Sequence, residues 1–337
     1  MADSRIVSAR AWCRVDLAGG TLDLWPLGLL SPNASTVNVA IQVPVRVELH
    51  GRGEGFAVEQ GDQRIEATSI EELRGHPDTA LVGVVAEAFS LDACEIRIHS
   101  GSPRGGGLGA SSALTVALVA AAETWLGSQP SSARRRAAIS RDLEARLMEL
   151  PTGQQDHIAA LLGGAHQIRH VPGGVEVDPI KTDLRALGRS LVVAYSGRSH
   201  FSAGNNWQVL RRRLDGDRDL AAVFDGLAGI AVEMKGALEA GDLPQAGRLL
   251  DREWGLRRQL SSEISTPTIE QLLQAARSLG AWGGKACGAG GGGCIAMLCP
   301  PNRKEGLTQQ LTLGGFQVLA DAVPADRPLL VEEGSSS

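Results

Sequence analysis

The stretch PRGGGLGASSA, residues 103–113, is the most informative part of this chain, because a glycine-rich loop runs there straight into an apolar segment. Residues 110–126 are rich in Ala, Leu and Val and predict a helix. Glycine tolerates positive φ and close backbone approach, and the first turn of a helix carries unpaired N–H groups and a partial positive charge. The loop and the helix start therefore predict an anion site, and a phosphate group is the ligand that we expect.

Two hydroxyls, Ser111 and Ser112, fall in the first turn of the predicted helix, where a hydroxyl can bond a phosphate oxygen or ligate a hard cation such as Mg²⁺. The loop lacks the G-x-x-x-x-G-K-[ST] pattern of a Walker loop and the spacing of a dinucleotide-binding fold. A glycine-rich stretch can also be an ordinary surface loop, so the interpretation depends on other motifs. The residues that we expect at the nucleotide phosphates are Pro103, Gly105, Gly106, Gly107, Leu108, Gly109, Ala110, Ser111 and Ser112.

Three further motifs occur in the chain: RVDLAGGTLD at residues 14–23, PTGQQDHIAA at residues 151–160 and KACGAGGGG at residues 285–293. In this order, and together with the glycine loop, they resemble the GHMP kinases, the superfamily of galactokinase, homoserine kinase, mevalonate kinase and phosphomevalonate kinase. The central loop matches the family pattern Pro-x-x-x-Gly-Leu-Gly-x-Ser-Ser. The resemblance spans residues 8–300, and RVDLAGG is most similar to the fucokinase and heptose-phosphate kinase branch.

The order of the predicted elements favours an α+β fold, with strands such as residues 36–50 followed by helices. A chain of 337 residues predicts two domains. The resemblance implies a ribosomal protein S5 domain 2-like N-terminal domain over residues 1–180 and a ferredoxin-like C-terminal domain over residues 181–333, with the active site in the cleft between them. We also expect a hairpin-like strand pair near residues 294–299 and 315–320.

The composition argues against nucleic acid and membranes as partners. The net charge of −5 is opposite to the basic face of proteins that bind nucleic acid. No apolar stretch reaches the roughly 18 uncharged residues of a membrane span, and the polar start lacks the apolar core of a signal peptide. Five cysteines without C-x-x-C spacing are typical of reduced thiols. We therefore expect a cytoplasmic protein that contacts neither nucleic acid nor membrane, as a monomer or a homodimer.

Asp156 is the candidate catalytic carboxylate. It opens an apolar segment, so a helix cap is the alternative interpretation. The resemblance favours catalysis, because Asp156 matches the family's G-x-x-D motif. Arg14 matches the position of a basic residue near that aspartate, and we expect it to hold Asp156 charged and to reduce negative charge on the transferring group. A surface charge at a strand end is the alternative for Arg14.

The acceptor is expected at the first motif. Gly19 and Gly20 allow a turn that includes Thr21, and Asp23 offers two oxygens to vicinal hydroxyls, which is how sugars are held. The distance in sequence from Arg14 to Asp23 equals that in galactokinase-like and fucokinase-like sequences, so the resemblance implies a sugar acceptor. Gly153, in the middle motif, is expected on the same side of the cleft.

The resemblance also implies a magnesium site. Comparable kinases place a metal-ligating glutamate near Glu144, which lies on the predicted helix of residues 134–149. Glu144 and Ser112 would then be the protein ligands of Mg²⁺, with water and phosphate oxygens completing the octahedron. An exposed glutamate without a ligand is the alternative for Glu144.

Two further groups are candidates for the substrate side of the cleft. Arg198 and His200 follow a predicted strand of the second domain and could bind a substrate phosphate, although an exposed loop has the same composition. Gly290, in the last motif, is expected to help shape the cleft beside the phosphate loop. A purely structural role is the alternative for this glycine.

These motifs predict an ATP- and Mg²⁺-dependent kinase that phosphorylates a hydroxyl, with the anomeric one favoured, of a monosaccharide or sugar phosphate. One alternative is a GHMP kinase that acts on a non-sugar alcohol, against which Asp23 argues. The other is a sugar and nucleotide sensor that keeps the fold without turnover, against which Asp156, Arg14 and Ser112 argue.

Overall fold

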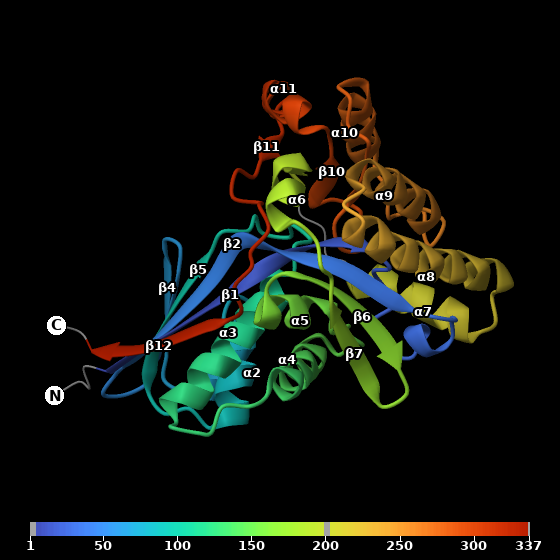
Figure 1. Cartoon of the computed structure of the whole chain (residues 1–337). Helices are drawn as coiled ribbons and strands as arrows, with labels where there is room; N and C mark the ends of the chain where they lie inside the picture. The colour runs from blue at the N-terminus through green and yellow to red at the C-terminus, as the bar shows by residue number, and fades with distance from the viewer. Residues whose placement is uncertain (1–4, 199–202, 336–337) are drawn as a thin grey trace.

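The computed structural model describes residues 5–198 and 203–335, which form two packed parts, each built on an antiparallel or mixed sheet (Figure 1). The larger sheet has eight strands. Its neighbours run in the order β12-β1-β2-β5-β3-β4, while β6 pairs with β2 and β7 pairs with β6. The β3–β5 pair is parallel and the other pairs are antiparallel. These strands are β1 (Arg5–Ala18), β2 (Ser35–Gly51), β3 (Phe56–Gln60), β4 (Gln63–Ala67), β5 (Cys94–Ser100), β6 (Ala165–Val171), β7 (Gly174–Pro179) and β12 (Leu330–Ser335).

The long strand β1 carries several residues of the first motif into the interior. Its first half alternates, with Val7, Ala9 and Ala11 buried and the residues between them half-buried, which is the period of a strand covered on one face. From Arg14 onward every residue of β1 is buried, since α8 and α9 of the second part pack against this end of the strand. The charged side chains of Arg14 and Asp16 are therefore enclosed between the two parts.

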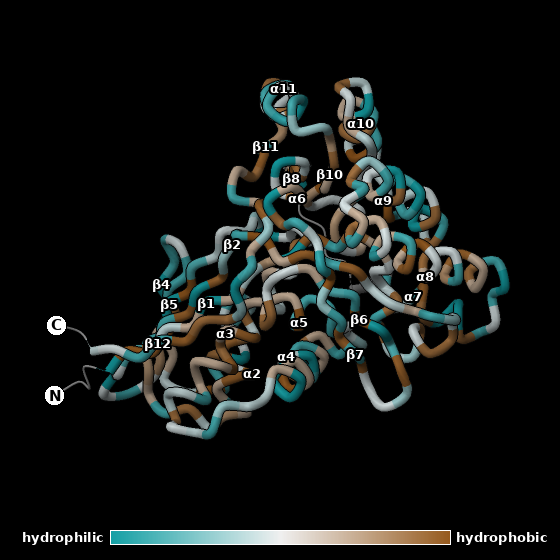
Figure 2. The backbone as a smooth tube through the Cα atoms, in the orientation of Figure 1, coloured by the Kyte–Doolittle hydropathy of each residue, from teal (hydrophilic) through white to brown (hydrophobic). Residues whose placement is uncertain are grey.

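Helices cover one side of the large sheet in Figure 1. The predicted helix of residues 110–126 is confirmed as α3, which begins directly after the glycine loop and packs on β1 and β2. The predicted helix of residues 134–149 is confirmed as α4. Figure 2 shows apolar residues gathered where α3 meets the strands. The helical elements of this part are η1 (Leu27–Leu29), α1 (Ile70–Gly75), α2 (Ala80–Phe89), α3 (Ala110–Trp125), α4 (Ala133–Met148) and α5 (Gln155–Leu162).

The second part is a four-stranded antiparallel sheet in the order β11-β8-β10-β9. Its elements are α6 (Leu184–Ser190), β8 (Leu191–Tyr195), α7 (Ala203–Leu214), α8 (Arg218–Glu239), α9 (Leu243–Arg257), α10 (Pro267–Ser278), β9 (Gly283–Ala286), β10 (Cys294–Leu298), α11 (Pro301–Leu313) and β11 (Gln317–Val318). The α+β class is thereby confirmed. Within the described residues, no helix combines the length and the apolar character that a membrane crossing requires.

The expected hairpin of residues 294–299 and 315–320 is wrong. α11 separates the two strands, and β10 and β11 each pair with a different edge of β8 instead of with each other. Strand alternation indicates that a segment is a strand but does not identify its partner. A second feature also depends on long-range pairing: β12 pairs with β1, so residues 330–335 join the large sheet and not the sheet of the preceding strands.

Candidate active site

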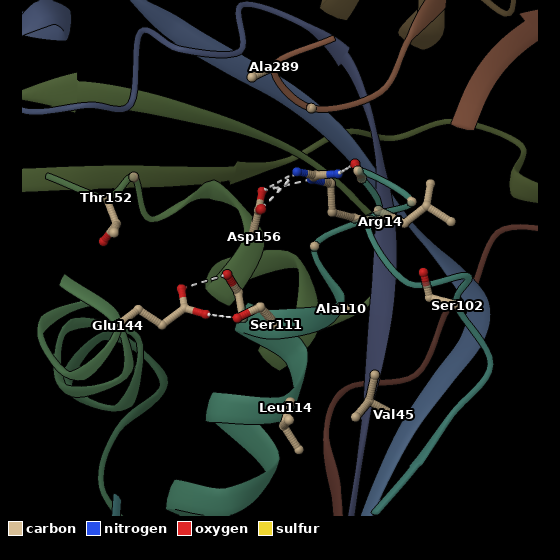
Figure 3. A pocket seen from close by; sticks show the side chains of 18 of the residues that line it. Arg14, Val45, Ser102, Ala110, Ser111, Leu114, Glu144, Thr152, Asp156 and Ala289 are labelled. Atoms are coloured by element: carbon tan, nitrogen blue, oxygen red, sulfur yellow. Dashed lines mark hydrogen bonds and ion pairs between the residues drawn. The ribbon is translucent and has the colours of Figure 1, made fainter. Parts of the chain in front are cut away.

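A cavity of about 580 Å³ lies between the two parts and collects segments from across the chain (Figure 3). Its wall includes the glycine loop, the end of β1, the starts of α3 and α5, and residues 288–289 of the second part. All nine residues expected at the nucleotide phosphates line this cavity, namely Pro103, Gly105, Gly106, Gly107, Leu108, Gly109, Ala110, Ser111 and Ser112. The cavity is therefore the candidate active site.

At two positions of the loop, close contacts with neighbouring atoms leave room only for glycine. Gly107 has φ +70°, and a Cβ there would lie 2.5 Å from the backbone oxygen of Cys287. Gly109 has φ +72° and caps α3, and a Cβ there would lie 3.2 Å from the carboxylate of Asp156. Because L side chains rarely adopt this backbone conformation, the loop can pass this close to its neighbours only with glycine at both positions. Asp156 therefore lies directly beside the N-terminus of α3.

Arg14 joins this carboxylate to the loop. Its Nε and Nη2 atoms donate to the two oxygens of Asp156, each at 2.7 Å, and its Nη1 donates to the backbone oxygen of Gly107 at 2.6 Å. The Arg14 side chain is buried, whereas that of Asp156 is 24% exposed. Burial alone would lower the pKa of Arg14, but the negative charges of Asp156 and Asp16 raise it above its ordinary value. Arg14 thus stays a cation that fixes Asp156 at the cavity wall.

A second carboxylate, Asp23, lies at the same end of the cavity. It accepts hydrogen bonds from the backbone nitrogen of Gln155 at 3.3 Å and from Gln155 Nε2 at 3.4 Å. A Cβ on Gly153 would lie 1.6 Å from Asp23 Oδ2, so the backbone of the middle motif passes directly over this carboxylate. Burial, together with the charge of Asp156, raises the pKa of Asp23 to about 6. Asp23 is thus a half-buried acceptor with few donors of its own.

Glu144 faces the start of α3 from α4 (Figure 3). Its carboxylate accepts hydrogen bonds from the hydroxyls of Ser111 at 2.7 Å and Ser112 at 2.9 Å, and His157 Nε2 lies 2.9 Å from its Oε2 atom. Burial alone would raise the pKa of Glu144, but His157 and the two hydroxyls lower it. A carboxylate beside two hydroxyls is an oxygen donor set that suits Mg²⁺. The described residues contain no cluster of three or more His, Cys, Asp or Glu with metal-binding geometry.

Several residues expected at the substrate do not line the cavity. Gly19 and Gly20 form the turn beneath Thr21, which does line it. Gly290 has φ +79° and packs against the backbone oxygen of Ile264. Arg198 is exposed, and its backbone oxygen accepts a hydrogen bond from the nitrogen of Gly293. His200 lies outside the described residues.

Other lining residues were not expected from the motifs. Val45, Leu81 and Ile98 contribute apolar side chains to the cavity wall. Asn206 of α7 lines the cavity from the second part. No sequence pattern marks these residues, because they come from elements that are far apart in the chain.

A buried group of charges is a further feature that the motifs did not predict. Lys285 stands within the last motif, yet its side chain is fully buried and pairs with Asp16 of the first motif. A lysine between apolar strand residues is a signal that could have been used, since a buried charge requires a partner.

Comparisons with known proteins agree with this geometry. Two family models match the chain: "GHMP kinases N terminal domain" over residues 79–164 and "GHMP kinases C terminal" over residues 234–313. A D-glycero-alpha-D-manno-heptose 7-phosphate kinase of Campylobacter jejuni is 27% identical, and the match spans 64% of each chain, slightly less than two thirds of that relative. A mevalonate kinase of Thermococcus onnurineus is 28% identical over 71% of this chain and 69% of its own length.

The solved structures extend the likeness to the whole chain. The crystal structure of a D-glycero-D-manno-heptose 1-phosphate kinase from Bacteriodes thetaiotaomicron has a TM-score of 0.78 at 20% identity. It covers 98% of this chain and 100% of its own. At this level of identity the likeness concerns the fold, which is the same two-part arrangement.

Proposed function

The chain belongs to the GHMP kinases, and on that basis we propose that it is an ATP-dependent kinase for a hydroxyl of a monosaccharide or sugar phosphate. The observation that carries the proposal is the contact of Arg14 with both Asp156 and the Gly107 carbonyl, which sets a carboxylate beside the cradle for the phosphates. The anomeric hydroxyl is the acceptor group that we propose. Because one relative is a heptose 7-phosphate kinase, a sugar phosphate with a free anomeric hydroxyl is the first acceptor to test.

In this proposal, Asp156 orients the acceptor hydroxyl and receives its proton. A carboxylate offers about four lone-pair sites, of which Arg14 occupies two. As the hydroxyl oxygen bonds to the γ-phosphorus, the bond to the β–γ bridging oxygen breaks, and ADP leaves with that electron pair. The proton moves to a free lone pair of Asp156. Arg14 opposes the build-up of negative charge on the transferring group.

The nucleotide is bound through its phosphates and its base. The glycine loop and the N–H groups at the start of α3 hold the phosphates by hydrogen bonds and by the helix dipole. The apolar lining from Val45, Leu81 and Ile98 suits the faces of a purine, because contact with it removes apolar surface from water. The cavity therefore offers a cradle for the phosphates of ATP and an apolar wall for its base.

Glu144 and Ser112 are the residues that we propose for Mg²⁺. Their oxygens match the preference of this ion, and the hydroxyl of Ser112 already faces the Glu144 carboxylate at 2.9 Å. When bound, Mg²⁺ neutralises charge on the β- and γ-phosphate oxygens. His157 holds Glu144 from behind, which fixes the direction of the carboxylate.

At the acceptor end, Asp23 supplies the recognition of hydroxyl groups. Its carboxylate is held by two weak hydrogen bonds from Gln155 and keeps lone pairs for further donors. Two adjacent hydroxyls of a sugar can donate to its two oxygens. A single alcohol cannot use both in this way, which favours a sugar over a simpler acceptor.

The test is a panel of acceptors with Mg²⁺ and ATP, comprising D-glycero-D-manno-heptose 7-phosphate, galactose, fucose and mevalonate, with ADP release and ³¹P NMR of the product as readouts. We expect transfer to a sugar or sugar phosphate and a loss of kcat of about 100-fold or more in Asp156→Asn. Asp142→Asn, on the exposed face of α4, is the matched control and should keep wild-type activity.

Two results would contradict the proposal. Transfer to mevalonate alone would assign the chain to the branch that phosphorylates non-sugar alcohols. Binding of a non-hydrolysable ATP analogue without transfer to any acceptor would identify a sensor that keeps the fold.

A further inference from the structure

Four charged side chains lie buried beneath the loop of residues 19–23. They are Asp16 on β1, Glu253 and Arg257 on α9 and Lys285 on β9, and each is at most 1% exposed. Lys285 donates to Asp16 and to Glu253, the latter at 3.1 Å, and Arg257 Nε donates to Glu253 at 3.0 Å. Two acids and two bases balance in this cluster, so no buried charge is left without a partner.

Arg257 also contacts the loop itself. Its Nη1 donates to Thr21 Oγ1 at 3.2 Å, and its Nη2 donates to the backbone oxygen of Gly20 at 3.1 Å. A Cβ on Gly20 would lie 2.4 Å from Asp16 Oδ2 and 2.8 Å from Arg257 Nη2. The loop therefore rests directly on the charged cluster, with no side chain between them.

The conformation of the loop requires such support. Thr21 has φ +74°, a left-handed conformation that a β-branched residue adopts only when its surroundings impose it. Thr21 and Asp23 both line the cavity at the end proposed for the acceptor. The position of both residues thus depends on what holds the turn from below.

The charges around the cluster keep it ionised. Burial alone would raise the pKa of Asp16, but Lys285, Arg257 and Arg14 lower it below its ordinary value. Burial alone would lower the pKa of Arg257, but Glu253, Asp16 and Asp23 raise it. The guanidinium of Arg257 thus remains a cation with a planar fork, whose Nε and Nη2 contact Glu253 while Nη1 and Nη2 contact the loop.

We propose that Arg257 is a positioning residue for the acceptor: it holds the loop of residues 19–23 in the shape that presents Thr21 and Asp23 to the sugar. Asp16, Glu253 and Lys285 hold Arg257 in place. The expected effect of Arg257 on turnover rests on the proposed function. The expected effect of Arg257 on the loop does not depend on any substrate.

The test compares Arg257→Lys with Arg258→Lys. Lysine keeps the buried charge but cannot reach Glu253 and both loop oxygens at once. Arg258 directly follows α9 as its C-cap, and its exposed side chain pairs with Glu270 at 3.3 Å, so it is a matched control. For R257K we expect the KM of the acceptor to rise by about tenfold or more, while kcat and the Kd of an ATP analogue change by less than about threefold.

Hydrogen exchange provides a readout without substrate. The amides of Leu22 and Leu24 donate to the oxygens of Gly19 and Thr21 within the turn. These amides should exchange faster in R257K than in wild type or R258K, whereas those of α3 should be unchanged. If R257K does not fold, Thr21→Ala removes one contact of Arg257 and should produce the same faster exchange.

The outcomes separate this inference from the proposed function. If R257K lowers only the melting temperature and leaves both acceptor KM and loop exchange as in wild type, Arg257 is merely structural and the inference is wrong. Equal rises in the KM of acceptor and nucleotide would also overturn it. If the wild type phosphorylates no sugar, the proposed function fails, and loop exchange still decides whether Arg257 positions the loop.

Discussion

Replacement of Asp23 by Asn should stabilise the protein and weaken its activity at the same time. The pKa of Asp23 is raised from 3.8 to about 6 by burial and by the charge of Asp156, against the opposing charge of Arg14. The shift of about two units corresponds to about 3 kcal/mol that the ionised carboxylate costs the folded state at pH 8. Asn leaves one of the two donors of Gln155 without an acceptor, which costs about 1 kcal/mol.

The expected net gain is about 2 kcal/mol at pH 8, or about 3 °C in melting temperature for a chain of this length. The sign follows from the raised pKa. The folded state holds the proton more tightly, so wild-type stability falls as the pH rises from 3.8 toward 6 and the penalty is complete above that. The advantage of D23N should therefore be smaller at pH 5 than at pH 8 by about 1 kcal/mol.

The assay is thermal unfolding followed by circular dichroism at both pH values, without ligands. Asp62→Asn, in the exposed turn between β3 and β4, is the matched control and should show no pH-dependent gain. The same D23N protein should bind the acceptor about tenfold or more weakly, and the wild-type KM for the acceptor should rise as the pH falls through about 6. A D23N protein with no gain in stability at pH 8 would refute the view that Asp23 is a half-buried carboxylate with too few compensating donors.

Three further substitutions test contacts in the cavity and in the last glycine motif. Gly153→Ala places a Cβ against the Asp23 carboxylate, so acceptor KM should rise by about tenfold while Gly255→Ala, in open space on α9, leaves kinetics unchanged. Glu144→Gln should weaken Mn²⁺ binding to the enzyme–ADP complex by about tenfold, measured by electron paramagnetic resonance, and unchanged binding would remove this residue from the metal site. Gly290→Val should lower the melting temperature and the activity together, because φ is +79° and the oxygen of Ile264 occupies the place of the Cβ; wild-type stability would show that the turn adapts.

The glycine loop was predictable because its chemistry is local. Glycines directly before an apolar helix favour an anion site, and the structure has that loop at the start of α3. The resemblance to a family then placed Arg14 and Asp156 in one site, although 142 residues separate them in the chain. Their hydrogen bonds follow from the fold and not from either motif alone.

The contacts of the buried charged cluster beneath the loop of residues 19–23 could not be predicted, because the paired residues are far apart in sequence. Lys285 and Asp16 are 269 residues apart, and Arg257 and Thr21 are 236 apart. The sequence patterns show that each residue is polar in an apolar setting, but not which partner neutralises it. The wrong hairpin prediction has the same origin, since β10 and β11 each pair with β8 and not with each other.

The central claim is that Asp156 acts on an acceptor hydroxyl beside the phosphate cradle, and single-turnover transfer from [γ-³²P]ATP tests it most directly. Asp156→Asn should bind the ATP analogue and the sugar with wild-type affinity and yet transfer the phosphoryl group at least about 100-fold more slowly. Transfer by D156N at the wild-type rate, with both ligands bound, would contradict the account.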